Sequence, residues 1–322
     1  MLEGNTALGK DRAFIEREEQ AARNARPAVS IGMPVYNGER SIRLALDSLR
    51  AQTFSNFELI ISDNASTDGT EAICREYAAR DNRIKYLRQS TNLGVGANFK
   101  FVLDAAQGEY FMWAACDDIR SSDFIEVNAA FLAANPGYVA STSPNGFEGR
   151  SMESGNLVSF ALDGDLYSRF EQFFEYCWAS HGIIYSLVRT EILRNCEIIG
   201  QSFMASDWAI DLYLVSHGKI HRTVEGYTLF GLNGICSSAG AYRAFRNSLI
   251  ELPLPFYRLS RYVMSLTRRF SLRQRAKVFL ALAKLNLWAV FDQSRAALYS
   301  FYCAVIKSRV RQWKSQGSSC RY

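Results

Sequence analysis

Two adjacent carboxylates, Asp117 and Asp118, directly follow the apolar run from Tyr110 to Ala115 and Cys116. The run predicts a buried strand, so the pair is expected where that strand ends. Neighbouring carboxylates repel each other unless a cation lies between them. Mg²⁺ and Mn²⁺ bind through one or two carboxylates and bridge to phosphate oxygens. The pair therefore predicts a metal-assisted reaction on a phosphate-bearing substrate, although one carboxylate could instead cap the helix that follows.

Three earlier strand candidates also end in polar residues, namely Tyr36, Asp63 and Asn92. The carboxyl ends of parallel strands meet at one edge of a sheet, where ligands bind in open α/β folds. A single Asp or Asn in such a place is ordinary turn chemistry. Its repetition at successive strand ends favours a ligand site.

Strands alternate with helices in the first part of the chain, which predicts βαβ units and a parallel sheet. The expected strands are 29–34, 57–62, 83–89 and 109–116, and the expected helices are 40–52, 66–80 and 94–107. Further on, the expected strands are 139–143, 182–189, 219–223 and 226–232, and the expected helices are 168–180, 204–218 and much of the chain after 253. No GxGxxG or GxxxxGK[ST] motif supports a dinucleotide fold or a P-loop.

Composition excludes several classes of protein. Of the 322 residues, 48% are hydrophobic and 21% are charged, which rules out a mostly disordered chain. The seven Cys are scattered without a CxxC pair, which argues against a disulfide framework or a Cys-rich zinc site and favours a reducing compartment. The charged N-terminus lacks the apolar core of a secretory signal.

Residues 29–70, 92–118 and 206–218 resemble, in order and spacing, the family-2 glycosyltransferases with a GT-A fold. The resemblance covers about residues 28–235. It implies an α/β fold with a Rossmann-like mixed sheet flanked by helices, followed here by a helical C-terminal extension. The expected divisions are a polar lead-in (1–27), a catalytic domain (28–240, with a nucleotide-binding half to 118 and an acceptor half from 119) and the extension (241–322).

The resemblance also implies a nucleotide site. Its residues in this chain are Pro34, Tyr36, Asn37, Glu39, Asp63, Asn92, Gly94 and Asp117. The loop after the first strand is expected to line the base pocket. Asp63 is expected to accept a hydrogen bond from the base imide, which favours uridine or thymidine. Asn92 and Gly94 are expected to close over the nucleotide, with Asn98 following on its helix.

For metal and catalysis, the resemblance implies that Asp118 binds Mn²⁺ or Mg²⁺ and that Asp117 lies towards the ribose or the donor sugar. The motif reads CDD, without the leading Asp of the fuller pattern. Asp207 matches the general base, although its neighbour is Ser206 where the family has an acidic residue. Asp211, one helical turn further on, is the rival candidate for the base. Alternatively, Asp207 is only a negative charge at a helix N-terminus, where the helix dipole favours it. Trp178 and Trp208 could stack on an acceptor sugar or pack in the core.

The expected function is an inverting transfer of a sugar from a nucleotide diphosphate, expected to be a UDP-sugar, to a hydroxyl of a glycan or lipid-linked glycan. A polyprenyl-phosphate sugar synthase would share the donor site, and a non-catalytic nucleotide-sugar binding protein would need no base. A nucleotidyltransferase is disfavoured because no Gly-rich loop bearing Arg or Lys follows the first strand.

Charge is divided unevenly along the chain. Residues 241–322 hold 16 Lys and Arg against two acidic residues, a net +14, whereas residues 1–240 carry a net −9. At helical spacing one basic stripe comprises Arg273, Lys277, Lys284, Arg295 and Arg309. The stripe predicts a peripheral location on the anionic inner face of the cell membrane. A helical cap on the catalytic domain is the alternative, and nucleic acid is disfavoured because no recognition motif accompanies the charge.

Overall fold

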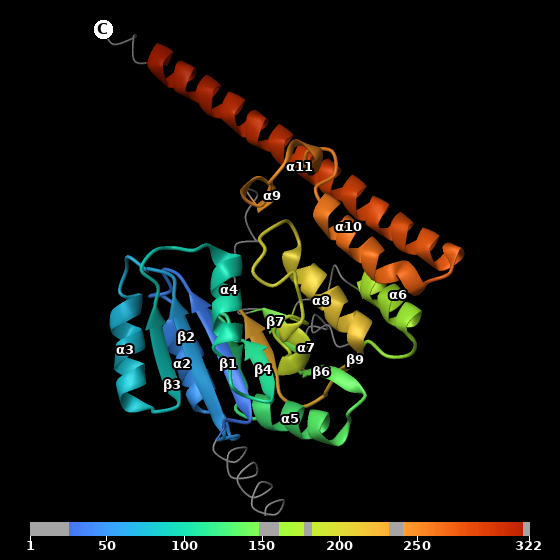
Figure 1. Cartoon of the computed structure of the whole chain (residues 1–322). Coiled ribbons are helices and arrows are strands. Elements are labelled where there is room, and N and C mark those ends of the chain that lie inside the picture. The colour runs from blue at the N-terminus through green and yellow to red at the C-terminus, as the bar shows by residue number, and fades with distance from the viewer. Residues whose placement is uncertain (1–25, 148–160, 177–181, 232–240, 318–322) are drawn as a thin grey trace, which may run out of the picture. The chain divides into compact units, whose positions relative to one another are not determined.

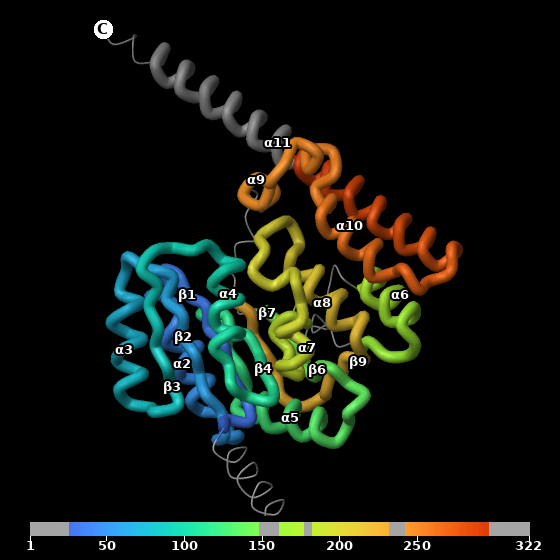
Figure 2. Tube along the Cα trace, in the orientation of Figure 1, coloured from blue at the N-terminus to red at the C-terminus, as the bar shows by residue number. Residues whose placement is uncertain are grey.

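The computed structural model describes residues 26–147, 161–176, 182–231 and 241–317, with side chains as far as residue 295 (Figures 1 and 2). The chain divides into two compact units. The first comprises Met1–Gln201 and Ile210–Leu232, and the second comprises Ser202–Ala209 and Asn233–Tyr322. Helix α8 (Ser206–His217) begins in the second unit and continues in the first.

A seven-stranded mixed sheet, in the order β3-β2-β1-β4-β8-β6-β9, forms the first unit. Its first four strands are parallel: β1 (Val29–Val35), β2 (Phe57–Asp63), β3 (Ile84–Arg88) and β4 (Tyr110–Trp113). The helices between them are α2 (Ile42–Arg50), α3 (Thr70–Arg80) and α4 (Val95–Asp104). The alternation and the parallel pairing confirm the predicted α/β fold and bring four strand ends to one edge (Figure 1).

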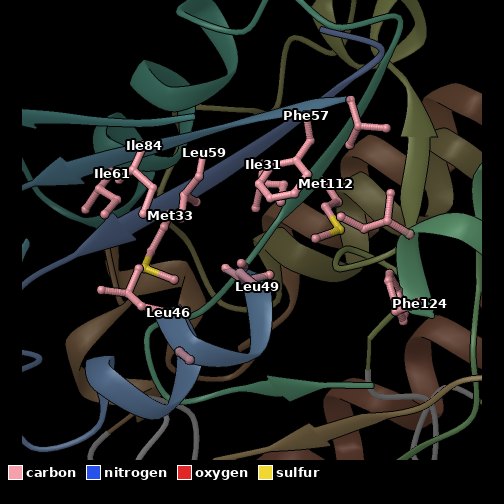
Figure 3. Close-up of a cluster of buried hydrophobic side chains, with 14 of the residues drawn as sticks. Ile31, Met33, Leu46, Leu49, Phe57, Leu59, Ile61, Ile84, Met112 and Phe124 are labelled. Carbon is pink, nitrogen blue, oxygen red and sulfur yellow. The ribbon is translucent and has the colours of Figure 1, made fainter. Parts of the chain in front are cut away.

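Apolar alternation in β1 and apolar spacing in α2 explain the core on one side of this sheet. Ile31 and Met33 lie two residues apart, so they share a face of the sheet. Leu46 and Leu49 of α2 lie near them in the same buried cluster (Figure 3). Burying each such side chain stabilises the fold by about 1.5–3 kcal/mol.

Helix α4 covers the other side of the sheet, and Gly32 allows its close approach. A Cβ at Gly32 would lie 2.6 Å from Cγ2 of Val102 on α4 and 2.7 Å from the ring of Phe111. No larger side chain fits there without displacing the helix. This glycine therefore fixes how closely α4 packs on β1, and hence where the loop before α4 lies.

The remaining strands complete two sheets. Strand β8 (Leu187–Arg189) runs antiparallel to both β4 and β6 (Tyr138–Thr142), and β9 (Lys219–Arg222) runs parallel to β6. A three-stranded sheet contains, in order, β5 (Ile119–Arg120), β10 (Thr228–Phe230) and β7 (Asn145–Phe147). The helices of this region are α5 (Phe124–Ala134), α6 (Leu166–Tyr176) and α7 (Thr190–Arg194).

The strand predicted over 182–189 is wrong for its first half. Gly182 has a φ of +105°, and its carbonyl accepts a hydrogen bond from the Tyr185 amide at 3.0 Å, so the chain turns there. Ile183 and Ile184 are buried within these turns, which is why the apolar run imitates a strand. The last part of the helix predicted over 168–180, including Trp178, lies outside the described residues.

Helices dominate the second unit, as predicted for the chain after 253. They are α9 (Ala241–Ala244), η2 (Leu249–Glu251), α10 (Tyr257–Leu266), η3 (Thr267–Arg269) and α11 (Leu272–Gly317). Within the described part of the chain, no helix has the length and apolar character needed to cross a membrane.

Candidate active site

The loops after β1 and β2 are held together by hydrogen bonds from both sides. The Asn37 amide donates to Oγ of Ser66 at 2.9 Å, and the Thr67 amide donates to Oδ1 of Asn37 at 2.8 Å. Oε2 of Glu39 accepts a hydrogen bond from the Gly69 amide at 3.0 Å, just before α3 begins. Two predicted nucleotide residues, Asn37 and Glu39, thus shape this edge by joining its loops. Pro34 is half-buried at the end of β1, and Tyr36 is exposed on the same loop.

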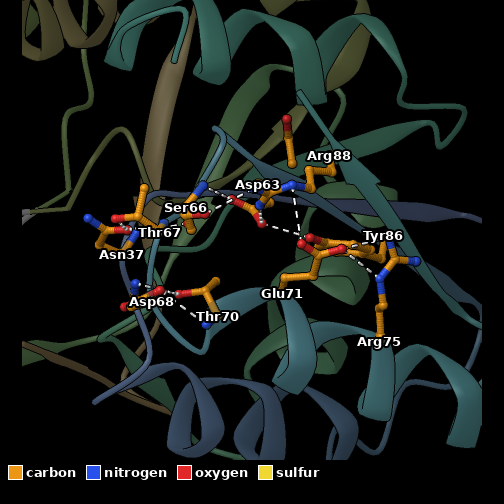
Figure 4. Close-up of polar contacts among 12 residues, drawn as sticks. Asn37, Asp63, Ser66, Thr67, Asp68, Thr70, Glu71, Arg75, Tyr86 and Arg88 are labelled. Carbon is orange, nitrogen blue, oxygen red and sulfur yellow. Dashed lines mark hydrogen bonds and ion pairs between the residues drawn. The ribbon is translucent and has the colours of Figure 1, made fainter. Parts of the chain in front are cut away.

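Asp63, at the end of β2, is the centre of a polar network (Figure 4). Its Oδ1 accepts a hydrogen bond from the Ser66 amide at 2.8 Å. Its Oδ2 accepts from the Tyr86 hydroxyl at 2.7 Å and from Nη1 of Arg88 at 2.8 Å. Arg88 also donates to the Ser66 carbonyl at 3.0 Å, and its Nε lies 3.3 Å from Oε2 of Glu71. The Asp63 side chain is fully buried, so a ligand can reach its carboxylate only if a covering residue moves.

The environment of Asp63 favours the ionised carboxylate. Burial alone would raise its pKa, but the hydrogen bonds from Ser66, Tyr86 and Arg88 outweigh burial, and the pKa is lowered. Burial raises the pKa of Tyr86, and the hydrogen bond that Tyr86 donates to Asp63 raises it further. A fixed anionic acceptor therefore lies at the end of β2.

Arg88→Gln is expected to lower the free energy of unfolding by about 1–3 kcal/mol, because it leaves a buried carboxylate without its charged partner. A carboxyl group whose folded pKa is lowered adds stability above its unfolded pKa, and that stability is lost as pH falls through the folded value. The variant should lose this stability at a higher pH than the wild type does. Urea melts at several pH values measure both effects.

Arg75→Gln is the matched control for this change, since Arg75 also pairs with Glu71 but is 62% exposed at its side chain. Its effect should be within about 0.5 kcal/mol. If the two variants unfold alike, Arg88 does not support Asp63.

Asn64, which directly follows β2, holds the loop between β3 and α4 by hydrogen bonds. Oδ1 of Asn64 accepts from the Leu93 amide at 2.8 Å, and its Nδ2 donates to Oδ1 of Asn92 at 2.9 Å. Gly94 has a φ of +84°, a conformation that favours glycine. Behind the loop, buried Asn98 exchanges hydrogen bonds with Ser62. The predicted residues Asn92 and Gly94 thus lie at the same edge as Asp63.

The carboxylate pair follows β4 at this edge. Asp118 is buried, and its Oδ1 accepts a hydrogen bond from the Gly231 amide at 3.2 Å, whereas its Oδ2 has no partner among the described residues. Asp117 is half-buried, and a Cβ at Gly231 would lie 2.3 Å from its Oδ2. Neither residue caps α5, whose N-cap is Asp123. The pair is therefore not used for helix capping.

Burial raises the pKa of Asp118 to about 6; the nearby Arg120 charge opposes this effect and the Asp117 charge adds to it. Arg120 is itself buried and donates from Nη2 to the Trp113 carbonyl at 3.0 Å, while its Nε and Nη1 lack partners in the described chain. Burial accordingly lowers the pKa of Arg120. A buried carboxylate with a free oxygen is costly unless something charged binds it.

These donors fit a hard divalent cation. The residues that the structure describes contain no group of three or more His, Cys, Asp or Glu that could hold a metal. Mg²⁺ and Mn²⁺ do not require one, because they are held by one or two carboxylates together with substrate phosphates and water. The unpartnered Oδ2 of Asp118 and the adjacent Asp117 supply that minimum.

Gly231→Ala is expected to displace Asp117, because the added methyl group would overlap its carboxylate. Metal-dependent nucleotide binding should weaken about tenfold or more, while the melting temperature changes little. Calorimetric titration of UDP in Mn²⁺ and in EDTA measures the effect, and Gly137→Ala, where a Cβ meets nothing within 4 Å, is the control. Unchanged affinity in Mn²⁺ would mean that Asp117 has no part in the site.

Asp207 lies in the first turn of α8, within the second unit, and is half-buried. Burial raises its pKa, with backbone amides of Trp208 and Asp207 opposing the effect. Trp208 stacks on Phe256, with ring centroids 5.9 Å apart and planes at 6°. The rival base Asp211 belongs to the first unit and is almost fully buried, which makes it the less accessible of the two carboxylates.

The residues that support the predicted ones were not predicted from the sequence. Tyr86 and Arg88 alternate on β3, so their shared face was available as a signal. Gly231 gave no such signal, because it reaches Asp118 from the segment after β10.

Part of the chain, including this edge, matches a known family model. Residues 30–184 match the model of glycosyl transferase family 2. EpsE of Bacillus subtilis strain 168, named as a glycosyltransferase, is 37% identical over 116 residues, which are 36% of this chain and 42% of EpsE. The glycosyltransferase GlyA of Streptococcus pneumoniae is 28% identical over 171 residues, 53% of this chain and 23% of GlyA. The chain thus spans less than half the length of these relatives.

Two solved structures share the fold. S. aureus TarS (residues 1–349) in complex with UDP-GlcNAc superposes with a TM-score of 0.60 at 20% identity, over 78% of this chain and 70% of that one. The mannosyltransferase PcManGT of Pyrobaculum calidifontis, in complex with GDP-Man and Mn²⁺, gives a TM-score of 0.52 at 18% identity, over 91% and 84% of the two chains. At these identities the likeness concerns the fold, which is the predicted GT-A fold.

Proposed function

Because residues 30–184 match the model of glycosyl transferase family 2, we propose that this protein transfers a sugar from a nucleotide diphosphate to a hydroxyl of a glycan or lipid-linked glycan. One observation carries the proposal. A single sheet edge holds both a fixed anionic acceptor, Asp63, and a buried carboxylate with an unpartnered oxygen, Asp118. The first suits a nucleobase, and the second suits the cation of a diphosphate.

For the base, we propose that Asp63 accepts a hydrogen bond from an imide N–H. Uracil and thymine offer that donor, whereas the N3 position of cytosine is an acceptor. Asp63 is kept ionised by Arg88 and Tyr86, so it can accept but not donate. Complexes of TarS with UDP and UDP-GlcNAc support a uridine donor, while the GDP-Man complex of PcManGT shows that the fold also holds guanosine donors.

For the diphosphate, Asp118 would hold Mn²⁺ or Mg²⁺, with Asp117 beside it towards the ribose or sugar. When bound, the cation neutralises charge that develops on the leaving nucleotide diphosphate. Gly231 keeps both carboxylates in place, by donating its amide to Asp118 and by leaving room for Asp117.

For the acceptor, Asp207 would take the proton of the attacking hydroxyl. Its pKa is raised by burial, which brings it nearer to the operating pH and strengthens it as a base. One base and one displacement imply inversion at the sugar carbon. This assignment depends on the motif position of Asp207, and Asp211 is its matched alternative.

A nucleotide panel tests the donor assignment. UDP, dTDP, GDP and CDP are titrated calorimetrically into the full-length protein with Mn²⁺, and UDP is expected to bind at least tenfold more tightly than GDP or CDP. Binding of CDP as tight as that of UDP would overturn the role of Asp63, because cytosine has an acceptor where uracil has the imide N–H. With a UDP-sugar, transfer to a polyprenyl phosphate in place of a hydroxyl acceptor would identify a polyprenyl-phosphate sugar synthase.

A further inference from the structure

Helix α11 has one buried face, which packs against α10 within the second unit (Figure 1). Its buried residues, Val278, Leu282, Leu285 and Ala289, recur every three or four positions. On α10, Leu259 and Val263 are buried. This face accounts for the packing of α11 within the second unit.

Asn286 fixes the rotation of α11 about its axis. Its Oδ1 accepts from the Phe256 amide at 2.9 Å, and its Nδ2 donates to Oγ of Ser260 at 3.2 Å. Turning α11 would break these largely buried hydrogen bonds, which is costly. The side of the helix that faces away from α10 is therefore also fixed.

That outward side carries large apolar residues. Leu272, Phe279 and Leu287 follow one another after seven and eight residues, about two turns each, so they line one side of the helix. Leu280 and Phe291 lie alongside, eleven residues apart. Leu272, Leu287 and Phe291 are 84%, 72% and 67% exposed, respectively. We call these five residues the outer apolar face.

A basic stripe borders the outer apolar face. Arg273, Lys277, Lys284 and Arg295 are all exposed. Lys284 lies four residues after Leu280, and Arg295 lies four residues after Phe291, so each is a direct neighbour on the helix surface. Trp288, 48% exposed, lies on the same border one turn beyond Lys284. Apolar residues flanked by Lys and Arg, with Trp at the border, are typical of helices that lie in a membrane interface.

We propose that the outer apolar face of α11 inserts into the headgroup region of an anionic bilayer, with the basic stripe against lipid phosphates. Membrane binding would bring the enzyme to a lipid-linked acceptor at the inner face of the cell membrane. Only this role of the binding rests on the proposed function.

Charge decides between a bilayer and a second copy of the chain. Over its full length α11 carries nine Lys and Arg and a single acidic residue, Asp292. Two copies joined along this face would bring like charges together, and an anionic surface would neutralise them. The basic stripe thus favours lipid.

The test uses the full-length protein with vesicles of phosphatidylcholine, with and without phosphatidylglycerol, in a flotation assay without nucleotide. The wild type should float with anionic vesicles. Arg273→Gln/Lys277→Gln/Lys284→Gln should weaken partitioning about 100-fold, because each basic residue near an anionic surface strengthens it about fivefold. Arg43→Gln/Arg75→Gln/Arg80→Gln removes the same charge from α2 and α3 and should float like the wild type.

A second pair of variants tests the outer apolar face. Leu287→Asn/Phe291→Asn should weaken partitioning at least tenfold and should still do so at high salt, where the electrostatic part is screened. Leu44→Asn/Val224→Asn changes two other exposed residues in the first unit and should have no effect. Vesicles should also shift the tryptophan emission to the blue, and Trp288→Phe should reduce that shift.

Failure of this inference can be told from failure of the proposed function, because flotation needs no donor or acceptor. Wild-type protein that does not float, or equal flotation of each variant and its control, would overturn the inference. So would a dimer in sedimentation that Leu287→Asn/Phe291→Asn dissociates, because the face would then bind a second copy. Flotation without any sugar transfer would leave this inference standing and count against the proposed function.

Discussion

Asp207→Asn is expected to lower turnover about 10²–10⁴-fold, the usual effect of removing a general base. Donor affinity should change less than twofold, because Asp207 has no assigned contact with the nucleotide. Steady-state kinetics with a UDP-sugar and the acceptor measure the first effect, and calorimetry measures the second. Asp211→Asn is the matched variant, one turn along the same helix. If transfer survives in Asp207→Asn and is lost in Asp211→Asn, the base is Asp211.

The pKa of Asp207 adds two further expectations. Because burial raises it, wild-type turnover should fall at a higher pH than an ordinary carboxylate would give, as pH decreases and the base is protonated. A carboxyl group with a raised folded pKa adds stability below its unfolded pKa, and this stability is lost as pH rises through the folded value. Asp207→Asn should therefore be at least as stable as the wild type at neutral pH. A destabilised variant would mean that Asp207 has a structural role.

Asp118→Asn is expected to weaken UDP binding at least tenfold in Mn²⁺ and to change it little in EDTA. It should also lower turnover about 10²–10³-fold, the scale of losing electrostatic stabilisation of a leaving group. The asparagine keeps an oxygen for the Gly231 amide, so the fold should persist. Asp104→Asn, at an exposed ion pair on α4, is the control. Equal loss of binding with and without metal would mean that Asp118 contacts the nucleotide itself.

The fold was predictable wherever one pattern dominates the local sequence. Strands β1 and β2 are buried along nearly their whole length, and α2 repeats its buried residues every three or four positions. Strands that alternate with helices in this way predict a parallel sheet, in which the strand ends share one edge. Strands β5 and β7, with two and three residues, are too short for a pattern and depend on pairing with β10.

The site was predictable at its strand ends but not in its supporting contacts. Asp63, Asn92 and Asp118 each follow a strand, so the topology brings them together. The hydrogen-bond donor to Asp118 comes from elsewhere: Gly231 follows β10, 113 residues further along the chain. Such contacts depend on tertiary pairing, which local propensity and spacing do not encode.

Release of UDP from a panel of UDP-sugars, by wild type and Asp118→Asn in Mn²⁺ and in EDTA, tests the central claim most directly. We predict that the wild type hydrolyses or transfers from at least one UDP-sugar in Mn²⁺, that EDTA abolishes the reaction, and that Asp118→Asn is at least 100-fold slower. A wild-type protein that binds UDP but releases none from any UDP-sugar, even with glycan acceptors present, would contradict the account and identify a nucleotide-sugar binding protein.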